Sequence, residues 1–279
     1  MSTINTVVTS PPYWGLRDYG QYDQLGLEET PEKFVENLVD VFREVKRVLR
    51  DDGTVWLNLG DSYSSHKDCK SIPQSLSKGT NAEKAHVIEK GKSVSRDTKK
   101  LKSVGLKNKD LIGIPWRVAF ALQADGWYLR QDIIWNKPNP MPESVQDRCT
   151  KSHEYIFLLS KSPKYYYDNE AIKEEIQVTS DMGNEKRNKR SVWTVTTKPY
   201  SEAHFATYPH DLIIPCILAG CPEGGTVLDP FGGSGTTAQV AAQLNRNAVL
   251  CELNQEYVEI AQKRLQDSLG MFLKLNINR

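Results

Sequence analysis

The sequence predicts an α/β protein built on a doubly wound, mostly parallel sheet. Short apolar, strand-like runs alternate with helix-like segments along most of the chain, and this alternation is typical of parallel strands joined by crossover helices. The 279 residues suffice for one large domain with an appended element. Two stretches rich in Lys and Arg interrupt the alternation and are predicted to be insertions.

The first 160 residues contain four predicted strands and two predicted helices. Residues 6–9 form a β-branched run that stops at Ser10-Pro11-Pro12, as a buried strand does where it enters a loop. Thr30 and Pro31 are typical of a helix start. Apolar residues then follow at helical spacing, and this helix is predicted to end near residues 51–53. Further strands are expected at 54–59, 127–135 and 155–160, and a second helix at 115–124.

The final third repeats the pattern with little interruption. Helices are predicted at 210–219, 236–244 and 256–269, and strands at 226–228 and 248–251. Residues 163–199 are polar and irregular, contain Lys186, Arg187, Lys189 and Arg190, and are expected to leave the sheet. The chain is therefore divided into segments 1–63, 64–109, 110–162, 163–199 and 200–279.

Charge is distributed unevenly along the chain. The formal net charge is +1, yet residues 64–109 contain twelve Lys and Arg against four Asp and Glu. A basic segment set into an acidic remainder is a pattern that phosphate-binding surfaces produce. A solvated Lys- and Ser-rich loop explains the same composition, and both interpretations hold if the loop orders only on a nucleic acid.

Several protein classes are disfavoured by composition. The five cysteines have no CxxC pairing or metal-ligand spacing, so neither a disulfide framework nor a metal site is expected. The N-terminal residues lack a basic region followed by an apolar stretch, and no window approaches the length of a membrane span. The sequence therefore predicts a cytoplasmic protein that does not associate with membranes.

A glycine-rich segment near residue 230 joins a predicted strand to a predicted helix. It runs Asp229-Pro230-Phe231-Gly232-Gly233-Ser234-Gly235-Thr236-Thr237, and such a loop lets the backbone approach a ligand closely. The next predicted strand is followed by Glu252, an acceptor for ribose hydroxyls. The pattern Gly233-x-Gly235-x-x-Ala238 also fits a dinucleotide fingerprint, so this motif leaves a dehydrogenase and a methyltransferase open.

A second motif, Thr9-Ser10-Pro11-Pro12-Tyr13-Trp14, favours the methyltransferase. It resembles the catalytic Asp/Asn/Ser-Pro-Pro-aromatic signature of the DNA methyltransferases that modify exocyclic amino groups, and the glycine loop is similar to that family's cofactor motif. Further matches lie at residues 113–117, 132–139, 153–155 and 204–209. Because the catalytic motif precedes the cofactor motif, the order resembles the circularly permuted beta class, with a seven-stranded Rossmann-like sheet.

The resemblance implies a role for each motif residue. Ser10, Pro11, Pro12 and Tyr13 would be catalytic: the Ser10 hydroxyl and the Pro11 carbonyl accept the amino hydrogens, and Tyr13 stacks on a flipped base. S-adenosylmethionine would be the cofactor. The cofactor-binding residues would be Thr9, Phe205, Ala206, Thr207, Asp229, Pro230, Phe231, Gly232, Gly233, Ser234, Gly235, Thr236, Thr237 and Glu252.

The resemblance also suggests the substrate and the partners. Serine in the first catalytic position favours cytosine N4 over adenine N6 in double-stranded DNA. Residues 163–199 would be the target-recognition element and 64–109 a DNA clamp. A homodimer and a cognate restriction endonuclease are left open as further partners. An RNA or translation-factor methyltransferase, a nicotinamide oxidoreductase and a non-catalytic DNA-binding remnant are the competing hypotheses.

Two expectations concern features that are not among these site residues. His153 stands beside Glu154 at a strand start and is expected to be structural, while His66, His86 and His210 fit no pattern. Members of the resembled class usually carry a strand upstream of the catalytic one, but only nine residues precede Ser10 here. Residues 271–277 are predicted to form a replacement edge strand.

Overall fold

The computed structural model describes residues 2–64, 104–176, 186–197, 208–270 and 274–277. The chain divides into two compact units. The first consists of Met1–Ser10, Val45–Asn58 and Gly126–Arg279, and the second of Pro11–Glu44 and Leu59–Asp125. Within the described residues no helix is long and apolar enough to cross a membrane.

The first unit contains a seven-stranded sheet with the order β7-β3-β4-β2-β1-β8-β9. The strands are β1 (Ile4–Thr9), β2 (Leu49–Leu59), β3 (Tyr128–Asn136), β4 (His153–Ser160), β7 (Val192–Thr194), β8 (Thr226–Asp229) and β9 (Asn247–Leu250). β1 pairs in parallel with both β2 and β8, and β8 pairs in parallel with β9. β4 is antiparallel to β3. The predicted α/β class and mostly parallel sheet are confirmed.

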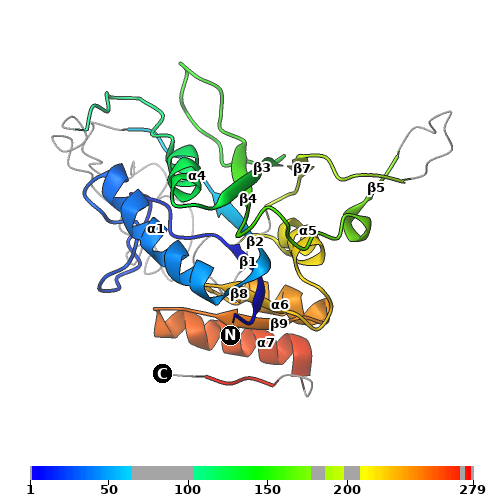
Figure 1. The fold of residues 1–279 in the computed structure, drawn as a ribbon. Helices are drawn as coiled ribbons and strands as arrows, with labels where there is room; N and C mark the ends of the chain where they lie inside the picture. The colour runs from blue at the N-terminus through cyan, green and yellow to red at the C-terminus, as the bar shows by residue number, and fades with distance from the viewer. Residues whose placement is uncertain (1, 65–103, 177–185, 198–207, 271–273, 278–279) are drawn as a thin grey trace, which may run out of the picture. The chain divides into compact units, whose positions relative to one another are not determined.

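The order of the strands places the first strand of the chain, β1, beside β8 from its final third. β1, dark blue in Figure 1, lies between β2 and β8, which belongs to the final third of the chain. Thr6 pairs with Val227 and Val7 with Leu228. Four adjacent parallel strands, β2, β1, β8 and β9, therefore end at one edge of the sheet, which is where open α/β sheets bind ligands.

The helices α5 (His210–Gly220), α6 (Thr236–Gln243) and α7 (Gln255–Leu269) also belong to the first unit. A hydrophobic core joins the sheet, through residues such as Val8 and Trp56, to α5, through Leu212 and Ile217. Gly220 ends α5 against the sheet: a Cβ there would lie 2.6 Å from Trp56 Nε1 and 2.7 Å from the Thr6 hydroxyl. Only glycine permits so close an approach.

The second unit contains α4 (Ile114–Ala124) and most of α1 (Pro31–Val48). Thr30 caps α1 as predicted, because its hydroxyl accepts the Lys33 amide at 3.2 Å. The Asp61 carboxylate accepts the amides of Gly113 and Ile114 at the start of α4, at 3.0 and 3.2 Å. A carboxylate at this position also matches the positive end of the helix dipole.

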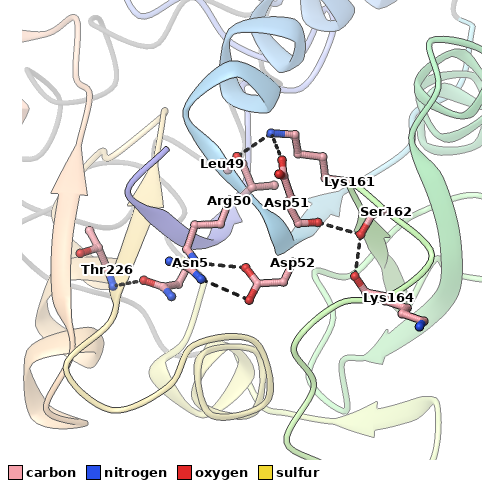
Figure 2. A network of polar contacts seen from close by, with 9 residues as sticks. All are labelled: Asn5, Leu49, Arg50, Asp51, Asp52, Lys161, Ser162, Lys164 and Thr226. Carbon is pink, nitrogen blue, oxygen red and sulfur yellow. Dashed lines mark hydrogen bonds and ion pairs between the residues drawn. The ribbon is translucent and has the colours of Figure 1, made fainter. Parts of the chain in front are cut away.

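The predicted end of the first helix is wrong. α1 ends at Val48, and residues 51–53 lie inside β2, where the register with β1 jumps from Ile4–Leu49 to Thr6–Thr54. Polar contacts hold this bulge: Arg50 donates to Asp52 at 2.9 Å, and the Lys161 ammonium lies 2.9 Å from an Asp51 carboxylate oxygen (Figure 2). Asp51, Asp52 and Gly53 thus form a β-bulge inside β2 and do not end the helix.

Two predictions about the sheet edges also need correction. Residues 163–199 were expected to leave the sheet, but β7 within them pairs in parallel with β3 and buries Trp193 in the core. The other described elements of this segment are the 3-10 helix η3 (Glu170–Ile172) and the short pair β5 (Glu174–Glu175) and β6 (Lys186–Arg187). The replacement strand at 271–277 is absent in its described part: residues 274–277 are exposed and irregular.

Candidate active site

A buried carboxylate joins β1 to β8 at the ligand-binding edge of the sheet. The Thr9 hydroxyl donates to Asp229 Oδ1 at 2.6 Å, and the Tyr208 and Thr237 hydroxyls donate to Asp229 Oδ2. The Phe231 amide donates to Oδ1 at 3.1 Å. Burial raises the pKa of the Asp229 carboxyl, and these four donors limit that rise. Asp229 therefore anchors the glycine loop to the end of β1.

The three glycines of the loop have different surroundings. A Cβ on Gly232 would lie 2.9 Å from Leu250 Cβ, and one on Gly235 would lie 2.9 Å from Ala261 Cβ. These two glycines let the loop pack against β9 and α7. Gly233 has φ +49°, and among the described residues a Cβ there would meet only the Phe231 carbonyl, at 3.9 Å. The described residues thus leave space for a ligand beside Gly233.

Glu252 holds the opposite side of this loop. Its Oε2 accepts the Gly233 amide at 2.7 Å, and its Oε1 accepts the Asn254 amide at 2.9 Å. Each carboxylate oxygen can accept a second hydrogen bond, so the orientation set by these amides leaves acceptor capacity for two ribose hydroxyls. The acidic residue after β9 and the open glycine thus fit a nucleoside.

Arg264 of α7 supports the loop and was not anticipated from the sequence. Its guanidinium is buried, donates to the Ser234 and Thr236 hydroxyls at 3.0 and 2.9 Å, and contacts His210 Nε2 at 2.8 Å. Ser234 and Thr236, predicted to bind the cofactor, are thus engaged by the protein. A lone arginine on an amphipathic helix gives no sequence signal that separates it from a solvated one.

Ser10 lies at the same edge as Asp229. It follows Thr9, which pairs with Leu57 of β2, and its side chain is half-buried. Ser10, which begins the proline-rich turn Ser10-Pro11-Pro12, and the glycine loop that begins at Asp229 therefore lie at the ends of two neighbouring strands, β1 and β8. Pro230 and Phe231 are half-buried at the start of that loop.

The remaining catalytic candidates, Pro11, Pro12 and Tyr13, belong to the second unit. Two glycines pack against Tyr13, Gly60 against its ring and Gly26 against its backbone. A Cβ on Gly60 would lie 2.5 Å from Tyr13 Cε2, and one on Gly26 would lie 3.2 Å from the Tyr13 carbonyl. Gly60 follows β2 directly, and its lack of a side chain leaves room for the ring.

Other predicted residues lie outside the described ones. They are Phe205, Ala206 and Thr207, most of segment 64–109 with His66 and His86, and residues 177–185 and 198–199 of the proposed recognition element. In the described part of this element, two arginines share one carboxylate: Arg187 and Arg190 both donate to Glu174 Oε1, at 2.9 and 2.6 Å. Burial disfavours the charged Glu174, but the two guanidiniums outweigh it and lower its pKa.

The part of the chain that the structure describes has no cluster of metal ligands, and burial makes three of its thiols less acidic. It contains no group of three or more His, Cys, Asp and Glu placed to hold a metal ion. Burial raises the pKa of the Cys221 thiol to about 11, and it also raises the pKa values of Cys216 and Cys251. These three thiols are therefore protonated at neutral pH and are poor nucleophiles.

The sheet order, the glycine loop and the acidic residue after β9 are those of a Rossmann-like fold, which binds nucleosides at this edge of its sheet. Over residues 4–263 the chain matches the family described as DNA methylase, of the N6- and N4-methyltransferase group. The protein belongs to this family of DNA methyltransferases, whose methyl donor is S-adenosylmethionine. The fingerprint shared with dehydrogenases is therefore that of a methyltransferase.

Individual relatives agree with this assignment. The chain is 54% identical to the type II methyltransferase M.Cfr9I of Citrobacter freundii over 95% of this chain and 82% of that protein. It is 53% identical to M.SmaI of Serratia marcescens, over 94% and 84% of the two chains.

Solved structures share the fold. The cytosine-N4-specific PvuII DNA methyltransferase matches with a TM-score of 0.64 and 19% identity, over 99% of this chain and 82% of that one. A complex of M1.HpyAVI with S-adenosylmethionine matches with a TM-score of 0.54 and 17% identity, over 94% and 89%. The predicted Rossmann-like methyltransferase fold is thus confirmed.

Proposed function

We propose that this protein methylates the N4 amino group of a cytosine flipped out of double-stranded DNA, at a specific site. The observation that supports this most is the position of Ser10, one residue beyond the Thr9–Asp229 contact of 2.6 Å. A neutral hydroxyl in this place accepts an amino hydrogen without adding a negative charge. The PvuII enzyme, which shares the fold, is named as cytosine-N4-specific.

The chemical difficulty is the low nucleophilicity of an amine conjugated to an aromatic ring. In our proposal the Ser10 hydroxyl and the Pro11 carbonyl accept the two amino hydrogens and draw the nitrogen toward tetrahedral geometry. Pro11 has no N–H to compete, and its ring restricts Ser10. Tyr13 stacks on the extruded base. The transfer would form one carbon–nitrogen bond and break the carbon–sulfur bond of the methyl donor, leaving a thioether, and the amino group would release one proton to solvent.

The structure contains residues that fit the methyl donor. Glu252 would accept both ribose hydroxyls, and the open side of Gly233 would face the nucleoside. Bound S-adenosylmethionine supplies an electrophilic methyl group on a sulfonium. Thr9, Asp229 and Thr237 would support the cofactor site without touching the cofactor, because the Thr9 and Thr237 hydroxyls both donate to the Asp229 carboxylate. Phe205, Ala206 and Thr207 remain proposed contacts to the methionine end.

Target recognition is assigned to residues 163–199. Arg187 and Arg190 extend from one carboxylate, and arginine is the side chain that most often reads guanine in the major groove. Segment 64–109 is proposed to clamp the DNA phosphates, which would explain its positive charge. A restriction endonuclease with the same site is the proposed cellular partner, since the relatives are named type II methyltransferases. Association into a homodimer and action in the cytoplasm complete the proposal.

Mass spectrometry of methylated DNA tests the target base. The protein is incubated with isotopically labelled S-adenosylmethionine and mixed-sequence duplex DNA, and the nucleosides are separated after digestion. We expect labelled N4-methylcytosine, and the S10A variant should form far less of it while still binding S-adenosylhomocysteine. Labelled N6-methyladenine would replace the proposed target with adenine, and transfer to RNA alone would refute a DNA substrate. Sequencing of the methylated DNA then identifies the site.

A further inference from the structure

Lys137 forms an ion pair at the edge of the sheet that contains Ser10. It directly follows β3, and its ammonium contacts Glu154, the second residue of β4. Asn58 Nδ2 donates to Glu154 Oε2 at 3.2 Å. Asn58 follows Leu57, the partner of Thr9 in the β1–β2 ladder. One chain of contacts therefore leads from Lys137 through Glu154 to the strand beside Ser10.

This ion pair is largely removed from solvent. The side chains of Lys137 and Glu154 are 17% and 15% exposed, and the ammonium lies 4.2 Å from the centre of the Trp135 ring. The indole is itself fixed, because its Nε1 donates to the Val195 carbonyl at 2.8 Å. Burying two charges costs free energy that their mutual attraction offsets only in part. The presence of the Lys137–Glu154 pair at the edge where such sheets bind ligands therefore points to a role in binding.

Lys161 provides an internal comparison at the other end of β4. Its side chain is 20% exposed and also pairs with a carboxylate, at 2.9 Å from Asp51. Figure 2 shows that its ammonium makes a second contact, to the Leu49 carbonyl at 2.8 Å. Among the described residues, the Lys137 ammonium donates to Glu154 alone. A lysine has three N–H donors, so Lys137 has donors left for a ligand.

We propose that Lys137 donates a hydrogen bond to the ring nitrogen next to the amino-bearing carbon of the flipped base, which is N3 in cytosine. Glu154 and Trp135 are the positioning residues that hold the ammonium. This inference rests on the proposed function, in which Ser10 contacts the neighbouring amino group. Adenine N1 occupies the equivalent place, so the contact does not depend on which of the two bases is methylated.

The contact serves binding of the base. A cationic donor at N3 withdraws electron density from the ring and makes the amino group less nucleophilic, so it cannot speed the methyl transfer itself. It instead replaces the pairing that N3 loses when the base leaves the duplex. Loss of Lys137 should therefore weaken binding of the extruded base and raise KM, with a smaller effect on kcat.

A chemical double-mutant cycle tests the proposal. Two duplexes carry the site found by methylation mapping and differ only in cytosine or 3-deazacytosine, which lacks N3, at the target position. Wild type and K137M are compared by kcat/KM for methylation and by the Kd for each duplex, measured in the presence of S-adenosylhomocysteine. We expect K137M to weaken binding and kcat/KM roughly 10- to 100-fold on cytosine, but less than about threefold on 3-deazacytosine, where the contact is already lost.

Equal losses on both duplexes would overturn the proposal, because Lys137 would then act without touching N3. K161M, the matched control, should behave as wild type on both. Removing one partner of a buried pair can destabilise the fold, so K137M/E154Q, which removes both charges, repeats the cycle. Failure of wild type to methylate any DNA would instead refute the proposed function, and a product of N6-methyladenine moves the same cycle to 1-deazaadenine.

Discussion

The Thr9 hydroxyl lies 2.6 Å from the Asp229 carboxylate, although 220 positions separate the two residues in the chain. This contact joins the last residue of β1 to the last residue of β8, the strands that lead into the proline-rich turn and the glycine loop. Methyl transfer requires the base and the methyl donor to meet within reacting distance. This contact inside the protein therefore fixes the end of β1, which Ser10 follows, relative to the start of the glycine loop.

Thr9→Val should separate the contribution of this contact from that of packing. Valine keeps the shape but loses a hydrogen bond to a buried carboxylate, which costs about 1.5 to 3 kcal/mol of unfolding free energy. Thr6→Val is the matched control: Thr6 is also fully buried on β1, but bonds to the neutral Thr54 and should cost only about 1 kcal/mol. Urea unfolding measures both, and only Thr9→Val should weaken S-adenosylhomocysteine binding. Equal effects of the two variants would contradict a special role for Thr9.

Gly233 and Gly235 should respond differently to alanine. Both have positive φ, which costs an alanine about 1 to 2 kcal/mol. At Gly235 the new Cβ also clashes with Ala261, so Gly235→Ala should lose about 1 to 3 kcal/mol more in unfolding free energy. Gly233→Ala should remain the more stable variant yet bind S-adenosylhomocysteine more weakly, because its methyl group enters the ligand space. Titration calorimetry and urea unfolding check the pair, and unchanged affinity in Gly233→Ala would place the nucleoside elsewhere.

Much of this site is local in the sequence, and the rest is not. The β-branched run before Ser10 and the glycine loop before α6 are contiguous patterns, so their strand and loop positions follow from propensity. The proximity of Ser10 to the glycine loop instead arises from the pairing of β1 with β8, which neither pattern encodes. The antiparallel direction of β4 and the pairing of β7 arise from contacts with distant strands, which no local pattern encodes. Arg264 stayed hidden for the same reason, since only folding places it beneath Ser234.

Gly60→Ala should impair the proposed stacking residue without affecting the cofactor site. The added Cβ would lie 2.5 Å from Tyr13 Cε2, so the ring must move. We expect kcat/KM for DNA to fall at least about 10-fold, with S-adenosylhomocysteine affinity retained. Tyr13→Phe keeps a ring able to stack and should stay active, whereas Tyr13→Ala should resemble Gly60→Ala. Full activity of Tyr13→Ala would remove stacking from the proposal.

Arg190→Ala should weaken DNA binding and flatten its salt dependence. Its side chain is 68% exposed and shares Glu174 with Arg187, so a groove or a phosphate can reach it. Loss of one phosphate contact lowers the slope of log K against log salt by about one; loss of a guanine contact instead relaxes the preference at one base pair. Arg50→Ala is the matched control, because Arg50 is half-exposed on Asp52 in the β2 bulge and should leave DNA binding unchanged. Fluorescence anisotropy at several salt concentrations distinguishes these results, and an unaffected Arg190→Ala would remove this arginine from the recognition element.

His153 should make the stability of the fold depend on pH. Burial lowers the pKa of this imidazole, nearby Lys151 adds to the effect, and Glu154 opposes it. Between the two pKa values the unfolded chain holds a proton that the folded protein has released. The contribution of His153 to the free energy of unfolding is therefore fully present above about pH 6.5, the pKa of an unperturbed histidine. It is lost progressively as the pH falls toward the lowered folded pKa. His153→Gln removes the titration, and its Tm should fall less than that of wild type between pH 7.5 and pH 5.5. Parallel Tm curves for the two proteins would show that His153 titrates alike in the folded and unfolded states.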